Sequence, residues 1–452
     1  MAADGLEAIG RRAVEAAIGA GAEDAEAWAE GSRGREIRVH RDEVESLTEA
    51  SERGVGVRAW IGHRSGYAFG TDLSDQGLRE VAEAAAAAAR VADADEHSAP
   101  PEAAGEAEEI EGLRDDAVAT TETTEVIELA RSIERTALAV DRITGVEEVV
   151  YVDSDGESAL ASSRGPSGSF AVSQCYAYLQ TLAGDDGEVQ TGLGFGVGRS
   201  PRDLDPEAIG TEAAEEAASM LGAGKPGSRS CPVVLADRVA ASFAGFIGGA
   251  LCADEVQRGR SPFANRLGQE LAAPAFELVD DGLDPDGLAS SPFDGEGIPR
   301  GRTRLISERR LLAYLHDSYT ARRGGAASTG SASRGSYRSP PVVSPSNLII
   351  EPGDPSLEQL LAEAGDGVYV TEVAGLHSGV NPVTGNFSVG ATGREIRGGE
   401  LADPVREFTI AGDLLGTLES ITAVGSDSRW VPFGGSVRSS PLLVGDIAIG
   451  GS

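Results

Sequence analysis

The stretches CPVVLADR, residues 231–238, and FAGFIGGALCADEVQRGRSPF, residues 243–263, decide how the second half of the chain folds. The first stretch is a short apolar run and predicts a buried strand. It leads into a predicted helix over 238–252. A polar segment rich in arginine follows this helix. The helix carries only glycine, phenylalanine, isoleucine and alanine at 245–250, and none of these side chains can bind a metal ion or move a proton.

The segments around this strand and helix indicate an α+β fold in both halves, with mainly antiparallel sheet. The chain has 452 residues, too many for one ordinary core, so we expect two domains. Hydrophobic residues make up 40% of the chain, which is enough to fill two cores. With 60 glycines and only 5% aromatic residues, we expect small side chains and close backbone contacts inside.

The best candidate for a domain boundary is GAGKPGSRS, residues 222–230, where glycine, proline and serine replace apolar residues. The chain therefore divides into predicted domains at 1–224 and 225–452. In the first domain, a helix over 4–20 precedes short alternating segments typical of a β-meander. The acidic segment 93–112 contains two adjacent prolines and predicts a solvated linker. Four more helices are predicted elsewhere, at 75–92, 122–140, 205–223 and 355–364.

Two glycine-rich segments resemble nucleotide-binding loops only superficially. GAGK at 222–225 lacks the first glycine of a phosphate-binding loop, and proline follows its lysine where serine or threonine is needed. GLGFGVG at 192–198 alternates glycine with leucine, phenylalanine and valine. That alternation fits a strand with one bare face better than a dinucleotide loop.

The charge of the chain is strongly acidic, with a formal net value of −35. Of the 38 basic residues only Lys225 is a lysine; the others are arginines. At molar salt the Debye length is only ~3 Å, so such a charge costs little stability and maintains solubility. We therefore predict a halophilic protein. An ordinary acidic protein of high-GC coding bias would explain the arginines but not the charge.

Several partner classes do not fit the sequence. Basic residues form no long cluster, which argues against direct binding of nucleic acid. Cys175, Cys231 and Cys252 are widely spaced, and they form neither a disulfide framework nor a close pair of metal ligands. No segment reads as a signal peptide or as the ~20 apolar residues of a membrane span. These features predict a soluble, cytoplasmic protein without a membrane partner.

Histidines do not gather in a pattern that would hold a metal ion. None of the five lies within four residues of another, so no helical pair of ligands exists. His377 stands out because it precedes the glycine-rich run GVNPVTGNFSVGATG. That run belongs to a predicted hairpin over 365–393, with a turn at Thr384, Gly385 and Asn386. The hairpin is either simply packed or presents an exposed strand edge to an extended peptide.

Five stretches, taken in order, resemble the TldD/PmbA family, in which the PmbA type is also called TldE. They are SLTEASERGVGVRAW, SSPFDGEGIPRGRTRLI at 290–306, LLAYLHDSYTARRGGAASTG at 311–330, VTEVAGLHSGVNPVTGNFSVGATG at 370–393 and PVREFTIAGDLLGTLESITAVGSD at 404–427. They span nearly the whole chain. The resemblance implies an N-terminal α/β domain and a C-terminal β-rich domain that is antiparallel and barrel-like.

The resemblance also implies a two-chain zinc metalloprotease. TldD-like chains carry HExxxH, in which histidines bind zinc and the glutamate acts as general base, and a C-terminal cysteine completes the site. Here the motif falls on 245–250, with Gly245, Phe246 and Ala250 at its key positions. The cysteine position falls near Phe433-Gly434-Gly435. The chain is thus similar to the PmbA type, with no catalytic residue, metal ligand or cofactor of its own and zinc in its partner.

The expected partner is a TldD-like homologue that bears HExxxH, or a second copy of the chain. Two such chains would enclose a chamber that admits only extended peptide. By family analogy the hairpin would line the chamber or the contact between chains. The residues expected to contact peptide or partner are His377, Asn381, Thr384, Gly385, Asn386 and Ser388.

Two other functions are compatible with the sequence. The chain could be a self-sufficient metallopeptidase with unusual ligands, such as His377 with Asp254 or Glu372. It could instead be a non-enzymatic peptide-binding or regulatory protein, because PmbA-type chains carry the label of DNA gyrase modulators. The leading hypothesis remains the non-metal subunit of a heteromeric zinc metalloprotease that acts on unfolded or short peptides.

Overall fold

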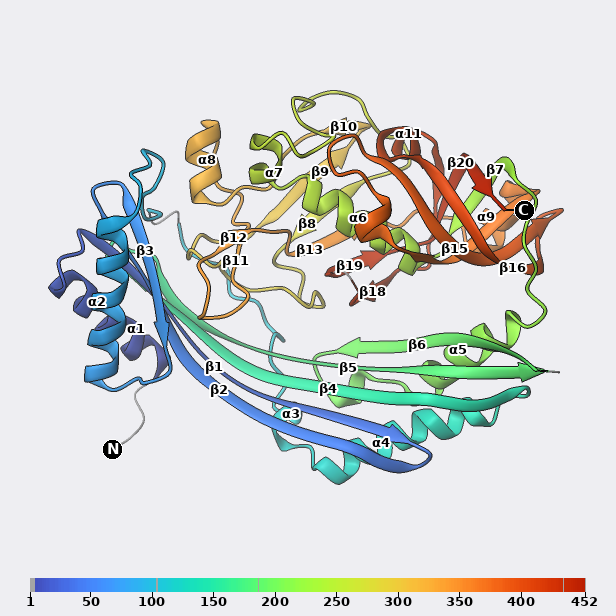
Figure 1. The fold of residues 1–452 in the computed structure, drawn as a ribbon, viewed down its shortest axis with the longest axis horizontal. Coiled ribbons are helices and arrows are strands. Elements are labelled where there is room, and N and C mark those ends of the chain that lie inside the picture. Colours follow the sequence, from blue (N-terminus) through green and yellow to red (C-terminus); the bar gives the residue numbers. More distant parts are fainter. Residues whose placement is uncertain (1–4, 103–104, 186, 434, 452) are drawn as a thin grey trace.

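The computed structural model describes residues 5–102, 105–185, 187–433 and 435–451. A long, strongly curved sheet from the N-terminal half lies opposite a β-rich body built from the rest of the chain (Figure 1). The concave side of the sheet faces that body (Figure 1). The α+β fold class is therefore confirmed.

The N-terminal sheet is antiparallel throughout, with the strand order β3-β2-β1-β4-β5-β6. Its strands are β1 (Asp24–His40), β2 (Glu43–Ile61), β3 (Arg64–Gly70), β4 (Ile143–Ser162), β5 (Ser167–Asp185) and β6 (Glu188–Gly198). Its helices are α1 (Leu6–Gly19), α2 (Asp75–Val91), α3 (Ala117–Thr120), α4 (Thr123–Leu138) and α5 (Pro206–Ser219), with a 3₁₀ turn at Pro201–Asp203. The predicted helix over 4–20 corresponds to α1, and its residue 4 lies outside the described residues.

The strands of this sheet are longer than the sequence predicted. Of the short alternating segments expected in this domain, those at 25–31 and 35–43 fall largely in one continuous strand, β1, which ends at His40. Gly31 and Gly34 do not interrupt it, because both pair with β2 on one side and β4 on the other. Toward its two ends β1 buries alternate apolar residues under the helices on the convex face: Ala25, Ala27 and Ala29 at one end and Ile37 and Val39 at the other.

Strand β6 has the predicted bare face, and helix α5 lies directly on it. A Cβ at Gly194 would stand 2.1 Å from the carbonyl oxygen of Ile209, and one at Gly192 would stand 2.2 Å from that of Ala213. Only glycine permits this approach. The opposite face of β6 carries Leu193, which lines a cleft toward the C-terminal body.

The C-terminal body contains a closed barrel of five strands. The pairing runs β16-β15-β14-β7-β20, and β20 pairs back onto β16. Only β7 and β14 are parallel neighbours in this circuit, and β17 attaches to β20 outside it. The strands are β7 (Arg229–Leu235), β14 (Gly367–Ala374), β15 (Asn386–Arg397), β16 (Glu400–Asp413), β17 (Ile421–Val424) and β20 (Leu442–Gly450). The predicted β-rich, barrel-like fold is thus confirmed.

A second sheet of order β10-β9-β8-β13-β19-β18 packs beside the barrel. Its strands are β8 (Leu278–Asp281), β9 (Arg302–Ser307), β10 (Arg310–Leu311), β13 (Asn347–Ile350), β18 (Arg429–Val431) and β19 (Ser436–Ser439). A separate short pair is formed by β11 (Ala332–Ser333) and β12 (Val342–Val343). The remaining helices are α6 (Asp237–Ala250), α7 (Ala253–Gln257), α8 (Ser318–Gly324), α9 (Leu357–Ala364), α10 (Leu376–Gly379) and α11 (Leu414–Glu419).

Helix α6 lies in the core between the barrel and the second sheet. It packs against β14 from the barrel and against β13, β18 and β19 from the sheet. Its buried side is apolar, with Val239, Phe243 and Ile247 at helical spacing. The strand and helix predicted at 231–252 are therefore present, and they anchor the largest apolar core of the described chain.

Three other features bear on the predictions. The described residues of 93–112 form neither helix nor strand. None of the helices seen in the described ranges is long and apolar enough to cross a membrane. The division of the chain at 224/225 stays a prediction.

Candidate functional site

Helix α6 has one side that is not buried. Residues at this side follow the helical repeat and are partly exposed: Arg238, Ser242, Gly245, Phe246 and Gly249. Two of the three positions that the family resemblance assigns to a metal motif lie on this stripe, and the third, Ala250, is buried. Hydrogen, phenyl and methyl groups offer no nitrogen, oxygen or sulfur donor to a metal ion. The residues at these three positions of α6 therefore do not fit zinc.

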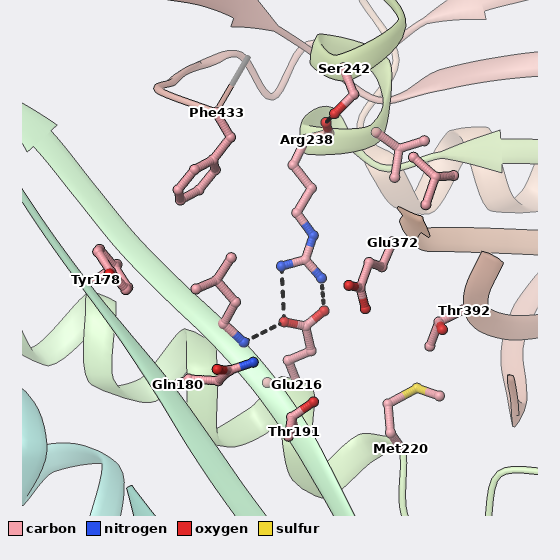
Figure 2. Close-up of a pocket in the computed structure, with 14 residues that line it drawn as sticks. Tyr178, Gln180, Thr191, Glu216, Met220, Arg238, Ser242, Glu372, Thr392 and Phe433 are labelled. Atoms are coloured by element: carbon pink, nitrogen blue, oxygen red, sulfur yellow. Dashed lines mark hydrogen bonds and ion pairs between the residues drawn. The ribbon is translucent and has the colours of Figure 1, made fainter. Parts of the chain in front are cut away.

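A cleft of about 310 Å³ opens beside the first turns of α6, between the curved sheet and the C-terminal body. One wall is formed by β5, β6 and the end of α5, and the other by α6, β14 and β15 (Figure 2). The lining residues are Tyr178, Gln180, Thr191, Gly192, Leu193, Glu216, Met220, Arg238, Val239, Ser242, Glu372, Val373, Thr392 and Phe433. Polar and apolar side chains thus alternate around the space.

An ion pair between Arg238 and Glu216 crosses the cleft and ties α6 to α5 (Figure 2). One guanidinium nitrogen of Arg238, Nη1, donates to Glu216 Oε2 at 3.0 Å. The same oxygen accepts the backbone N–H of Leu193 at 2.9 Å. Arg238 Nε donates to the carbonyl oxygen of Thr371 at 2.6 Å. Glu216 is therefore fixed between the outer edge of β6 and the helix of the C-terminal body.

Burial lowers the pKa of the Arg238 guanidinium, while the carboxylates of Glu372 and Glu212 raise it. Arginine stays cationic under such shifts because its ordinary pKa lies above ~12. Arg238 is thus a permanent cation in its ion pair with Glu216. The pair is partly shielded from water, with 15% and 19% of the two side chains exposed.

A second set of contacts also holds α5 and the curved sheet against α6. Arg429 pairs with Glu212 on α5 at 2.6 Å and also with Asp237 at the start of α6. Its guanidinium carbon lies 4.4 Å from the ring centroid of Phe195 on β6. Phe195 in turn meets Phe433 edge-on, with ring centroids 5.0 Å apart. Charged and aromatic contacts therefore fix the curved sheet against α6.

A second cavity, of about 510 Å³, lies along the same join. Arg238 and Glu216 line both this cavity and the cleft. The ion pair therefore separates two neighbouring spaces between α5 and the C-terminal body.

Glu372 on β14 is the third charged group of the cleft. Its carboxylate makes no hydrogen bond or ion pair with any described residue, and the side chain is exposed. Figure 2 shows it beside the Arg238–Glu216 pair, on the wall opposite β6. The cleft therefore contains one carboxylate without a hydrogen bond or ion pair among the described residues, whose charge acts only at a distance on Arg238.

The residues predicted to contact peptide or partner lie elsewhere, around the far end of the β14–β15 hairpin. His377 is on the short helix α10, and Asn381, Thr384, Asn386 and Ser388 are exposed. The Asn381 carboxamide oxygen accepts the backbone N–H groups of residues 383 and 384, which shapes the turn. Gly385 has φ +79° and lies against Pro262 and Leu414. None of the six lines the cleft, and their role stays a prediction.

The exposed-edge interpretation of this hairpin is wrong for β15, which pairs with β14 on one side and with β16 on the other. It stays a prediction for the end of β14, because β14 pairs with β7 only at Val368, Tyr369 and Val370. Below the exposed turn, Phe387 packs edge-on against Phe243 of α6, with ring centroids 5.2 Å apart. Strand β6 also has a free edge next to the cleft, because among the described strands it pairs only with β5.

The ligands considered for a self-sufficient metal site do not converge. Asp254 lies on α7, where it pairs with Arg258, whereas His377 and Glu372 are near the barrel hairpin. Across the part of the chain that the structure describes, no group of three or more His, Cys, Asp and Glu could hold a metal ion. The three cysteines are buried and unpaired. The family's cysteine position near 433–435 includes Gly434, which lies outside the described residues.

Sequence reasoning missed the Arg238–Glu216 pair, and it named Glu372 only as a possible metal ligand. Glu216 is one of several glutamates within the helix predicted at 205–223, and Arg238 is the first residue of the helix predicted at 238–252. The one feature of the sequence that could have indicated Arg238 is its charge at the start of an otherwise apolar helix. Its meeting with Glu216 depends on how the two halves pack, which no local pattern encodes.

Comparison with known families gives matches along most of the chain. The model of the PmbA/TldA metallopeptidase domain 1 matches residues 25–89, that of the central domain matches 116–221, and that of the C-terminal domain matches 228–451. The metalloprotease PmbA of Escherichia coli O157:H7 is 30% identical over 455 residues, covering 99% of this chain and 96% of that protein. A TldD homologue of Haemophilus influenzae is 27% identical over 442 residues, covering 89% and 87%.

Solved structures share the fold. A crystal structure from Thermotoga maritima, described as a modulator of a DNA gyrase, has a TM-score of 0.90 at 26% identity and covers 98% of this chain and 100% of its own. TldE from Thermococcus kodakarensis has a TM-score of 0.90 at 22% identity, with 98% and 99% covered. The second likeness concerns the fold alone.

Proposed function

Because the chain belongs to the PmbA/TldD metallopeptidase family, we propose that it is the non-metal-binding subunit of a heteromeric zinc metalloprotease acting on unfolded or short peptides. One observation carries the proposal. Helix α6, at the centre of the C-terminal core, has Gly245, Phe246 and Ala250 where the family resemblance places HExxxH. These side chains supply no ligand to zinc and no general base. Cleavage of a peptide bond then needs a second chain that carries the metal.

The cleft beside α6 supports a role in binding extended peptide. β6 is an edge strand, and Leu193 and Thr191 line the cleft, but the N–H of Leu193 already donates to Glu216, so a peptide would pair with other main-chain groups of this edge. An extended peptide can add main-chain hydrogen bonds to such an edge while side chains enter adjacent pockets. In this proposal the hairpin residues His377, Asn381, Thr384, Gly385, Asn386 and Ser388 contact the peptide or the partner farther along.

The curved sheet supports a role as a chamber wall. On its concave side, Tyr176 and Tyr178 of β5 stack with ring centroids 6.5 Å apart and planes 13° apart. Both rings are only partly buried, although the sheet curves toward the C-terminal body (Figure 1). The partner that closes the chamber is a TldD-like homologue bearing HExxxH and zinc; the alternative is self-association.

Peptide processing is favoured over the gyrase label as a direct activity. A protein with a net charge of −35 offers little attraction to DNA, so a direct action on the DNA substrate of gyrase is disfavoured. A regulatory role through peptide processing is compatible with the label printed for the Thermotoga maritima structure.

The test compares the purified chain with a co-purified complex containing the HExxxH homologue. Elemental analysis is expected to find no stoichiometric zinc in the chain alone, and a fluorogenic peptide to stay uncleaved. Adding the homologue is expected to give a stable complex and hydrolysis that chelators abolish. As a control, replacing the glutamate of the partner's HExxxH by glutamine abolishes hydrolysis but not assembly. Zinc at about one ion per isolated chain, with chelator-sensitive hydrolysis, would overturn the proposal.

A further inference from the structure

We infer that the cleft beside α6 binds a cationic side chain, arginine or lysine, of an extended peptide, with the Glu372 carboxylate as its ion-pair partner. This inference rests on the proposed peptide-binding function and narrows it to one class of side chain. Neither the family assignment nor the zinc-free α6 implies such a preference.

The availability of Glu372 is the first argument. Both oxygens of Glu216 are engaged, because Oε2 accepts from Leu193 and Arg238 and Oε1 faces Arg238. Glu372 has no such partner among the described residues, yet it lines the same space. Figure 2 shows the Glu372 carboxylate beside the Arg238–Glu216 pair. An incoming cation would therefore meet a carboxylate that makes no hydrogen bond or ion pair of its own, although its charge also acts on the nearby Arg238 guanidinium.

The charge balance around the join is the second argument. The cleft and the neighbouring cavity are together lined by five carboxylates and three guanidinium groups, which leaves a net charge of −2. These groups are Glu212, Glu215, Glu216, Asp237, Glu372, Arg238, Arg394 and Arg429. A confined space whose lining has a net charge concentrates ions of the opposite charge. The site therefore favours a cationic group and disfavours an acidic one.

The apolar part of the lining is the third argument. Met220, Val239, Val373 and Phe433 surround the space next to the charged groups, and Tyr178 adds an aromatic ring. Arginine and lysine have long apolar stems that pack on such walls while the charged head reaches a carboxylate. An aromatic face also attracts a cation directly. A peptide amino terminus has a charge but no such stem, so it would leave these walls uncovered.

The experiment measures binding of labelled nine-residue peptides to the full-length chain by fluorescence anisotropy. The peptides consist of alanine, glycine and serine with one central residue, which is arginine, its neutral isostere citrulline, or glutamate. Measurements at 1 M KCl suppress unspecific attraction to the acidic surface, because the Debye length there is only ~3 Å. Ion pairs in direct contact inside the cleft persist.

We expect the arginine peptide to bind about tenfold more tightly than the citrulline peptide. Glu372→Gln is expected to reduce this preference to less than about twofold, and Glu372→Arg to favour the glutamate peptide instead. The matched control, Glu363→Gln, removes an exposed glutamate from α9 and is expected to keep the full preference. Circular dichroism verifies that each variant is folded.

The experiment distinguishes failure of the cation site from failure of the proposed peptide-binding function. Equal binding of the arginine and citrulline peptides, or an unchanged preference in Glu372→Gln, overturns the cation site and leaves peptide binding intact. Absence of binding for all three peptides, to the chain alone and to its complex with the HExxxH homologue, overturns both the site and the peptide-binding role.

Discussion

Arg334 and Glu26 form a buried ion pair between residues 308 positions apart in the chain, with 2% and 1% of their side chains exposed. The pair joins β1 of the curved sheet to the segment after β11. Arg58 extends it, because its guanidinium lies 3.0 Å from Glu26 and 3.0 Å from Glu296. Two guanidinium groups thus alternate with two carboxylates across the join.

Replacing Glu26 by glutamine is expected to lower the free energy of unfolding by about 3–5 kcal/mol, because it leaves two buried guanidinium groups with one carboxylate. Urea denaturation at constant high salt measures the change. Glu45→Gln is the control, since Glu45 is exposed on β2 and is expected to change the free energy by less than ~0.5 kcal/mol. Equal effects of the two substitutions would contradict the importance of the network.

Two adjacent glycines of α6 are expected to respond to alanine in opposite directions. A Cβ at Gly248 would stand 2.4 Å from Leu348 Cδ1, so Gly248→Ala is expected to destabilise by ~1–3 kcal/mol through overpacking. A Cβ at Gly249 meets nothing within 4 Å, so Gly249→Ala is expected to stabilise by ~0.5–1 kcal/mol through helix propensity. Thermal unfolding of both variants measures the difference. A stabilising effect at both positions would contradict the packing of α6 on β13.

Stability is expected to depend on pH through Asp280, whose pKa is raised by burial to about 6 from the ordinary 3.8. A carboxyl group with a raised pKa binds its proton more tightly in the folded state. Its contribution to stability therefore falls as pH rises from about 4 to about 6, and is constant above. In Asp280→Asn the contacts to Ser346 persist, because both its N–H and its hydroxyl bond to one oxygen, Oδ1.

Relative to the unsubstituted chain, Asp280→Asn is expected to gain stability as pH rises through this window, by up to roughly 3 kcal/mol. Urea denaturation at pH 4, 5, 6 and 7.5 measures the difference between the two proteins. A difference that does not change with pH would show that Asp280 is ionised in the folded state throughout.

The acidic composition predicts that folding depends on salt. The chain has a net charge of −35, and repulsion among its acidic side chains is weakest when the Debye length is short. The Debye length is ~3 Å at 1 M salt and ~10 Å at 0.1 M salt. The midpoint of urea denaturation is therefore expected to rise steadily from 0.1 M to 3 M KCl. Full stability below ~0.1 M salt would contradict the halophilic interpretation.

Local patterns in the sequence predicted local structure well. The alternating glycines at 192–198 form the bare face of β6, and the apolar run at 231–237 leads into α6. Strand length was underestimated, since Gly31 and Gly34 stay in β1 only because strands on both sides pair with them. Such pairing depends on residues far away in the chain.

The same reason explains why the sequence did not show that both edges of β15 are covered. Residues 386–397 look like an outer strand when the hairpin is considered alone, but β16 covers one side of β15, and the barrel closes through β20. The Arg238–Glu216 pair likewise joins two separate layers. The sequence offered Glu372 only as a possible metal ligand with His377. Its place beside the Arg238–Glu216 pair depends on the packing of distant segments and could not be predicted from local spacing.

The two faces of strand β6 differ in how well they tolerate substitution. On one face, Gly192 and Gly194 tolerate no added carbon, because α5 fills the space down to the backbone. On the other face, Leu193 and Thr191 border an open volume. Divergence in ligand preference among relatives of this chain would thus accumulate at odd-numbered positions of the strand, while the even-numbered ones remain invariant.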